Sequence, residues 1–263
     1  MKRLLLFLLL SVPAWAALNL TTADSQYVNA TAVLNNVNTD QVGSVTAWVN
    51  VCHTAAASRI ITFGDTDAAT YVNLYISTDP KFFAVAANAA GGGVRWTLET
   101  NAAISLGVHL FGISHNGTQA TLYVDGVAVA QTFTGSTDKT VWIGDLAAID
   151  SVQIGTQNFN SLGYRNFLND ITWDVRVYSV ALTAKQHRDL FCAQGSDKMY
   201  MKADSCKMRL PLDQYGDGTS STAGMSLYDL SAYANHGLPG SAKATKVYPI
   251  FRGAPVKKHG ARQ

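Results

Sequence analysis

Short apolar runs separated by turn-forming residues restrict the fold of this sequence more than any other feature. Each run is rich in Val, Thr, Ala and aromatic residues and is bounded by Gly, Asn or Asp, which is the pattern of short β-strands. No long helical period interrupts them, and this many strands fill two packed sheets better than one small barrel. The sequence therefore predicts an all-β, two-sheet antiparallel sandwich whose strands include SVTAWVNV, RIITFG, YVNLYIS, FFAVAA, VRWTLET, HLFGISHN, QATLYVDGVAVAQ, TVWIGD, VQIG and ITWDVRVY.

Two hairpin turns are visible in the second half of this pattern. Asp125 and Gly126 interrupt QATLYVDGVAVAQ with the residue pair that a tight type I′ turn requires. Asn116 and Gly117 repeat the signal one strand earlier. A three-strand meander is therefore expected over residues 109–131.

One short helix is predicted after the last strand pattern. Thr183 is followed three residues later by Gln186, which is the arrangement of a capping box. The helix should cover residues 184–191 and turn Leu190 and Phe191 toward the sandwich.

The first sixteen residues, MKRLLLFLLLSVPAWA, have a basic start, an apolar run and an end made of small residues, as in a secretory signal peptide. The apolar run is too short to span a bilayer, and no later stretch approaches the roughly 20 apolar residues of a spanning helix. We expect a protein that is secreted or held at the cell surface, periplasmic or extracellular. The remaining length suits one domain over residues 17–240 and a basic tail over residues 241–263.

Charge is divided unevenly along the chain. Residues 17–197 contain 8 basic and 14 acidic residues, whereas residues 198–263 contain 10 basic and 4 acidic ones. The basic end has three interpretations: it docks on the acidic body, it contacts an anionic partner, or it is simply solvated. Nothing in the sequence indicates specific recognition of nucleic acid.

Three cysteines in an exported chain allow one disulfide. Cys192 and Cys206 close a short loop, whereas Cys52 falls in an apolar strand pattern. We therefore predict a Cys192–Cys206 disulfide and a buried Cys52 thiol. Metal binding by these cysteines is not expected, because no Cys-x-x-Cys pair is present.

Three segments resemble, in order, the laminin G-like jelly roll of the concanavalin A-like lectin/glucanase superfamily. SVTAWVNV with RIITFGD resembles a strand pair of that family, HLFGISHNGTQATLYVDGVAVA resembles its hairpin meander, and ITWDVRVYSVALTAKQ resembles its closing strand and turn. The resemblance covers roughly residues 18–191 and implies a lectin-like jelly roll.

The resemblance also raises the question of calcium, which this superfamily often binds. Where the family commonly has two adjacent acidic residues before the closing strand, this chain has Trp173 and Asp174, so one metal ligand is missing. Asp65 and Asp67, in the loop TFGDTDAAT, are the remaining candidate calcium ligands, since hard cations bind several oxygens. Solvation of a turn explains these two carboxylates equally well.

The segment that resembles the family's first strand and turn lies at the unexpected end of the chain. LYDLSAYANHG occupies residues 227–237, while the mature chain begins at LTTADSQYVNA, which resembles the family's following strand. Too few residues follow Gly237 to form a core of their own, and a vacant sheet edge invites aggregation. We therefore predict a circular permutation in which residues near 207–237, anchored by Leu210, complete the sandwich.

The strand YVNLYIS contains the candidate carbohydrate site. Side chains alternate along a strand, so Tyr71, Asn73 and Tyr75 point away from the core. Aromatic rings stack on sugars and amides bind hydroxyl groups, and Trp96 is a candidate second platform. The alternative is that these aromatic residues only cover a half-exposed sheet. The remaining tryptophans considered, Trp48, Trp142 and Trp173, are expected in the core.

The same superfamily includes glycoside hydrolases, which need two carboxylates flanking the scissile bond. Glu99 is the only glutamate in the chain, and Asp170 and Asp174 are four residues apart in a strand pattern and share a face. The resemblance gives Asp174 a structural position. The histidines beside strand ends and turns, His53, His115 and His236, are likewise expected to be structural.

The sequence thus predicts a secreted, non-catalytic carbohydrate-binding or adhesion module whose partner is a glycan or a glycosylated surface. One alternative is a structural or interaction subunit that uses the sandwich as a scaffold. The other is a glycoside hydrolase.

Overall fold

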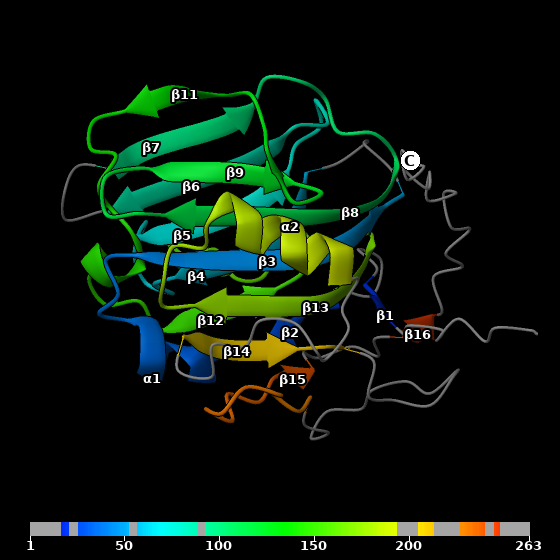
Figure 1. Ribbon diagram of the computed structural model, residues 1–263. Helices are drawn as coiled ribbons and strands as arrows, with labels where there is room; N and C mark the ends of the chain where they lie inside the picture. The colour runs from blue at the N-terminus through cyan, green and yellow to red at the C-terminus, as the bar shows by residue number, and fades with distance from the viewer. Residues whose placement is uncertain are drawn as a thin grey trace, which may run out of the picture.

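Two antiparallel sheets pack face to face in the computed structural model (Figure 1). The structure describes residues 17–20, 26–52, 57–88, 93–193, 205–212, 227–239 and 245–247. The predicted signal peptide and all of the predicted basic tail except residues 245–247 lie outside these ranges. The predicted two-sheet jelly-roll sandwich is confirmed.

The first sheet has the strand order β10-β9-β8-β3-β13-β1-β16, with β14 also paired to β13. Its strands are β1 (Ala17–Asn19), β3 (Gly43–Val51), β8 (Gly107–His115), β9 (Ala120–Val124), β10 (Val127–Ala128), β13 (Ile171–Tyr178), β14 (Cys206–Leu210) and β16 (Thr245–Val247). The second sheet has the order β11-β7-β6-β5-β4-β12-β2-β15. Its strands are β2 (Val28–Asn29), β4 (Ser58–Gly64), β5 (Tyr71–Ile76), β6 (Phe82–Asn88), β7 (Gly93–Thr100), β11 (Gln131–Ser136), β12 (Ser151–Ile154) and β15 (Leu238–Pro239).

The predicted meander is present as β8, β9 and β10. Asp125 and Gly126 both have positive φ, 53° and 76°, as the type I′ turn requires. The preceding turn differs from the prediction, because only Gly117 has a positive φ there. Asn116 instead accepts hydrogen bonds at Oδ1 from the backbone N–H groups of Thr118 and Gln119, so its side chain forms the turn.

The helix α2 (Ala184–Ala193) covers the outer face of the first sheet (Figure 1). The backbone N–H of Thr183 donates to Gln186 Oε1 over 2.8 Å, which confirms the predicted cap. Phe191 stacks on Trp48, and Trp48 stacks on Trp173, with ring centroids 5.7 Å apart in both pairs. Helix α2 and these stacked rings therefore cover the outer face of the first sheet. None of the helices in the described ranges is long and apolar enough to cross a membrane.

Three short helical segments in the described ranges were not predicted: η1 (Thr31–Val33), α1 (Leu34–Val37) and η3 (Ile143–Asp145). The expected strand TVWIGD is therefore wrong. Asp145 accepts the backbone N–H of Trp142 at Oδ2, which closes a turn. Gly144 donates to Asp40 O, and a Cβ at position 144 would lie 2.4 Å from Thr39 C. This close backbone contact is compatible only with glycine.

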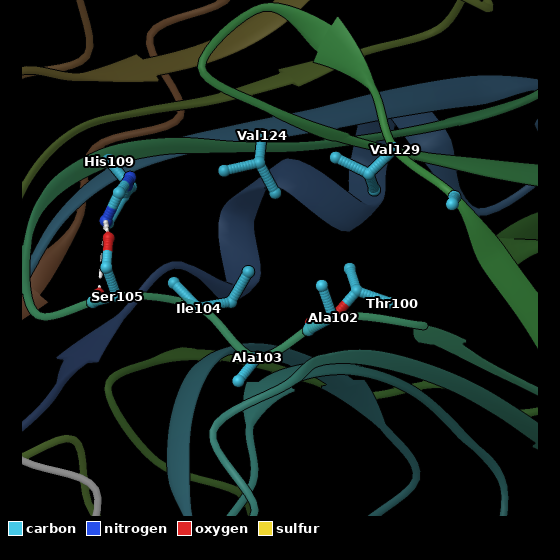
Figure 2. A pocket seen from close by; sticks show the side chains of 9 residues that line it. Thr100, Ala102, Ala103, Ile104, Ser105, His109, Val124 and Val129 are labelled. Carbon is cyan, nitrogen blue, oxygen red and sulfur yellow. Dashed lines mark hydrogen bonds between the residues drawn. The ribbon is translucent and has the colours of Figure 1, made fainter.

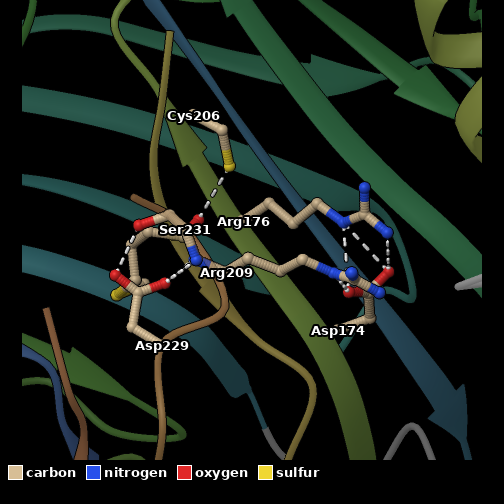
Figure 3. A network of polar contacts seen from close by, with 7 residues as sticks. Asp174, Arg176, Cys206, Arg209, Asp229 and Ser231 are labelled. Atoms are coloured by element: carbon tan, nitrogen blue, oxygen red, sulfur yellow. Dashed lines mark hydrogen bonds and ion pairs between the residues drawn. The ribbon is translucent and has the colours of Figure 1, made fainter. Parts of the chain in front are cut away.

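The predicted return of the chain to the sandwich is observed in β14. Its residues pair antiparallel with β13, with Leu210 opposite Val175. Leu210 is completely buried in the main core. Figure 3 shows Arg176 and Arg209 converging on Asp174. Arg209 Nε lies 2.8 Å from Asp174 Oδ1, so an ion pair joins the returning strand to the body.

The turn at residues 227–237 is held by the carboxylate of Asp229. Its Oδ1 accepts the backbone N–H of Arg209 over 2.7 Å, and its Oδ2 accepts the backbone N–H of Asn235 over 2.8 Å. Asn235 Nδ2 also donates to Asn36 Oδ1 over 2.7 Å, which links the turn to the beginning of the described domain. These contacts fit the predicted permutation, since the late segment packs on its own domain.

The cysteine predictions were wrong. All three thiols are free: Cys52 and Cys192 are exposed, and Cys206 is buried. Cys52 lies just beyond the end of β3 rather than within it. Cys206 begins β14, where its thiol donates to Met208 O, and Cys192 lies in the last turn of α2. Cys206 is buried in the cluster with Trp48 and Trp173, whereas Cys192 is at the surface.

Candidate functional site

The strand β5 turns two sets of side chains to opposite faces of the second sheet. Val72, Leu74 and Ile76 lie in the main core. Tyr71 and Tyr75 are half-buried on the opposite face, and Asn73 between them is fully buried. The alternation predicted from the sequence is therefore present, but Asn73 is covered.

Residues 157–165, which follow β12, form a segment that covers Asn73. Gln157, in this segment, accepts a hydrogen bond at Oε1 from Asn73 Nδ2 over 3.2 Å. Asn73 Oδ1 accepts the hydroxyl proton of Thr62 over 3.1 Å. Both polar ends of Asn73 are thus engaged within the protein, so this amide orients Gln157 rather than a sugar hydroxyl.

Both tyrosine rings stack on neighbouring aromatic rings. Tyr71 stacks on Phe159 with centroids 4.0 Å apart, and Tyr75 stacks on Phe83 with centroids 5.1 Å apart. The guanidinium carbon of Arg59 lies 3.9 Å from the centroid of Tyr75. Neighbouring side chains therefore take up ring faces that were expected to stack on a sugar. The polar groups of Tyr71, Tyr75 and Arg59 distinguish this sheet face: two phenol hydroxyls and a guanidinium.

Two arginines give this face its electrostatic character. Arg59 Nε donates to Gln157 Oε1 over 2.6 Å, and Arg165 lies 5.7 Å from the ring centroid of Phe159. The pKa of Arg59 is lowered to about 10, mainly by burial, and the positive charge of Arg165 contributes to this decrease. Burial raises the pKa of Tyr71, and both guanidinium groups oppose that rise. Both cations therefore act on the same tyrosine. We call Arg59, Tyr71, Tyr75, Gln157 and Arg165 the arginine–tyrosine face.

Trp96 does not belong to this face, which corrects the sequence prediction. Its side chain is fully buried, and its Nε1 donates to Val141 O over 2.8 Å. Residues on β7 alternate, and Trp96 shares the inward side with Leu98. The remaining tryptophans that were assigned to the core, Trp48, Trp142 and Trp173, are buried as predicted.

The carboxylate of Asp65, one of the two candidate calcium ligands, forms hydrogen bonds within a turn. Asp65 Oδ1 accepts the backbone N–H groups of Asp67 and Ala68 over 2.9 and 3.2 Å. Across the described ranges, no group of three or more His, Cys, Asp or Glu side chains could hold a metal ion. Asp65 thus fixes the loop between β4 and β5, because a carboxylate can replace a backbone acceptor in a tight turn.

The carboxylates considered for hydrolysis are engaged elsewhere. Asp170 and Asp174 are both buried, and Asp174 forms ion pairs with Arg176 and Arg209. Glu99 pairs with Lys81 over 3.1 Å. The predicted structural position of Asp174 is therefore confirmed.

The histidines within the described residues also have structural contacts. His115 Nε2 lies 2.9 Å from Lys139 O, and its ring stacks on Trp142. His236 Nδ1 accepts the backbone N–H of Asp229 over 3.0 Å. His53 lies outside the described residues.

A separate apolar pocket of about 300 Å³ lies beside β8 and β9. In Figure 2, Ile104, Val124 and Val129 face the cavity, and Ser105 and His109 stand at one end. His109 Nδ1 lies 2.9 Å from Asp125 Oδ2, and His109 Nε2 lies 3.1 Å from Ser105 Oγ. This order of groups is that of a nucleophile, a base and an acid in hydrolases.

The contacts of His109 argue against that use. The hydrogen bond to Asp125 is the main cause that raises the pKa of His109, and a contact with Ser105 O raises it further. Nε2 lies 3.1 Å from that carbonyl oxygen, which favours a proton on Nε2. A nitrogen that donates its proton to a carbonyl oxygen is not free to accept the serine proton. Ser105, His109 and Asp125 therefore act as a clip that holds the loop before β8.

Sequence reasoning did not find Arg59, Gln157, Phe159 and Arg165. A signal for Arg59 was available, since it is a cation inside the apolar run SRIITFG. It stands opposite Tyr75 in the antiparallel pairing of β4 and β5. Residues 157–165 carry no comparable signal, because only the tertiary structure places this segment over β5.

Comparison with known proteins agrees with the fold. Residues 22–186 match the family model Laminin_G_3, described as Concanavalin A-like lectin/glucanases superfamily. No curated protein sequence matches the chain.

Three solved structures illustrate the likeness. A putative carbohydrate binding protein from Bacteroides ovatus shares 17% identity, with a TM-score of 0.55 and coverage of 91% of this chain and 61% of its own. The CBM40 module of a Ruminococcus gnavus IT-sialidase shares 17% identity, with a TM-score of 0.50 and coverage of 61% of this chain and 86% of its own. A NanB sialidase variant from Streptococcus pneumoniae shares 11% identity, with a TM-score of 0.55 and coverage of 67% of this chain and 28% of its own. At these identities the likeness concerns the fold. The family match over most of the chain is the stronger finding, and the protein belongs to the laminin G-like family of the concanavalin A-like lectin/glucanase superfamily.

Proposed function

We propose that this chain is a secreted, non-catalytic carbohydrate-binding module and that its ligand binds at the arginine–tyrosine face. The observation that carries the proposal is the grouping of Tyr71, Tyr75 and Arg59 on one sheet face, with ring stacking and a hydrogen bond that hold them in place. Prepositioned hydroxyl and guanidinium donors suit a ligand rich in oxygen acceptors.

The other face of the sandwich is less suitable. Helix α2 packs there on Trp48, so a ligand would have to displace a hydrophobic cluster. The apolar pocket beside β9 has a lining made mostly of alanine, valine and isoleucine side chains. A saccharide would leave its hydroxyl groups without partners there, at a cost for each.

Two considerations support a binding role without catalysis. Asp170 and Asp174 are buried, and Asp174 is neutralised by two arginines, so neither is placed as a glycosidase carboxylate. The Ruminococcus gnavus CBM40 module was solved with α2,3-sialyllactose bound, so a related sandwich takes a glycan. Export is proposed from residues 1–16, which have the composition of a signal peptide.

The test is binding of the purified chain to an array of glycans. We expect a selective signal that the double variant Tyr71→Phe/Tyr75→Phe weakens at least tenfold, because it removes both hydroxyls and keeps the ring packing. Tyr228→Ala, at an exposed tyrosine in the C-terminal turn, is the control and should bind as wild type. Selective binding that the double variant retains would move the site elsewhere. Absence of any glycan signal, with self-assembly in light scattering, would favour the alternative of a structural or interaction subunit.

A further inference from the structure

The arginines of the arginine–tyrosine face differ from Arg176, Arg209 and Lys81, which pair with carboxylates. Arg176 and Arg209 share the carboxylate of Asp174, and Lys81 pairs with Glu99. Within the described part of the chain, neither Arg59 nor Arg165 forms an ion pair with a carboxylate. The face therefore carries two positive charges that the described residues do not neutralise.

Arg59 is held in place although its charge is not compensated. Its Nε donates to Gln157, and its guanidinium packs on Tyr75. Its Nη1 is buried and has no hydrogen-bond partner among the residues that the structure describes. A buried cation without an anion is costly, and most such groups in proteins are paired. A bound anion would remove that cost.

The geometry brings a second cation close to the first. Arg165 packs near Phe159, and Phe159 stacks on Tyr71, the neighbour of Tyr75 on the same side of β5. Like charges that approach each other repel, and a shared anion between them converts this repulsion into attraction. Guanidinium groups bind carboxylate and sulfate in a bidentate manner, and phenol hydroxyls add further donors.

We propose that the saccharide bound at this face is acidic, and that its carboxylate or sulfate group binds between Arg59 and Arg165. This inference rests on the proposed function and narrows it to a ligand class. Tyr71 and Tyr75 donate to oxygen atoms of the same saccharide. Neutral glycans lack the group that compensates the two guanidiniums, so they bind much more weakly.

The experiment uses the full mature chain and matched small glycans, with titration calorimetry as the readout. 3′-Sialyllactose supplies a carboxylate, 3′-sulfolactose supplies a sulfate, and lactose is the neutral reference. A glycan array with neutral and acidic members of the same backbones extends the comparison to other sugars. We expect at least a tenfold higher affinity for the acidic member of each pair than for the neutral one. Comparison of 3′-sialyllactose with 3′-sulfolactose decides whether a carboxylate or a sulfate is preferred.

Variants assign the preference to residues. Arg59→Gln should lose at least tenfold in affinity for the acidic glycan and should remove most of the preference over the neutral partner, whereas Arg59→Lys should fall between it and wild type. Arg188→Gln, at an exposed arginine on α2, is matched in chemistry and should have no effect. Lys257→Gln/Lys258→Gln tests the basic end of the chain and should also have no effect. Thermal melting of each variant separates loss of binding from loss of fold.

Three results would overturn the inference. Equal binding of neutral and acidic partners would contradict it and leave the proposed function intact. If binding of the acidic glycan were lost in the Lys257→Gln/Lys258→Gln variant and kept in Arg59→Gln, the site for the acidic glycan would lie at the basic end of the chain. Absence of binding to every glycan would overturn the inference together with the proposed function.

Discussion

Arg209 and Asp174 are 35 residues apart in sequence and form a buried ion pair, with Arg209 Nε 2.8 Å from Asp174 Oδ1. Arg176 contacts the other carboxylate oxygen. One carboxylate thus neutralises two guanidiniums and ties β14 to β13 at the edge of the first sheet.

Asp174→Asn should be strongly destabilising because it leaves two buried guanidiniums without an anion. Removing one partner of a buried ion pair typically costs about 3–5 kcal/mol. Urea unfolding followed by tryptophan fluorescence measures the change. Asp189→Asn breaks the exposed pair with Lys185 and is the control, with an expected cost below about 0.5 kcal/mol. Equal effects of the two substitutions would show that the buried network has no special role.

Leu210→Ala tests whether the returning strand is part of the core. The side chain is completely buried, so its truncation should cost about 2–5 kcal/mol. Leu238→Ala, at an exposed leucine in β15, should change stability by less than about 0.5 kcal/mol. Calorimetric melting gives both values. If the Leu210 variant melted as wild type, β14 would not be an integral strand of the sandwich.

The His109–Asp125 clip should make stability depend on pH. The hydrogen bond to Asp125 raises the pKa of His109 above its unfolded value, so the folded state binds the proton more tightly. The stabilisation is complete below the unfolded pKa of about 6.5 and is lost as pH rises through the folded value. The pair is partly exposed, so its contribution is below about 1 kcal/mol.

Asp125→Asn removes the charge and keeps an oxygen for the backbone N–H of Leu110. Unfolding free energies at pH 5.5 and pH 8.5 should show a larger gap between wild type and variant at the lower pH. A gap that widened toward pH 8.5 would contradict the assigned protonation.

Thiol reactivity should follow burial. Cys52 and Cys192 are exposed and should react with a disulfide reagent in the native protein, whereas Cys206 should react only after unfolding. Burial raises the pKa of Cys206 to about 12, which further suppresses its thiolate. Counting reactive thiols before and after denaturation, with peptide mapping, checks this. Detection of a peptide in which Cys192 and Cys206 are linked would show that the disulfide predicted from the sequence forms after all.

Local patterns alone predicted the sandwich, the helix α2 and the Asp125–Gly126 turn, because alternation, capping and turn chemistry act between residues close in sequence. The same alternation placed Tyr71 and Tyr75 on the face opposite Val72 and Leu74. It misplaced Trp96, since a period of two does not say which of the two faces is the core.

Contacts between distant segments decided the rest. The burial of Asn73 depends on Gln157, the stacking of Tyr71 depends on Phe159, and the different burial of Cys192 and Cys206 depends on where α2 and β14 pack. The sequence by itself determined most of the strands and the alternation of side chains along them, since both follow from short-range chemistry, and its resemblance to a known family indicated the late return of residues 227–237. Only the tertiary structure gathered Arg59 and Arg165 beside Tyr71, because their association depends on a segment without strand signal folding back over β5.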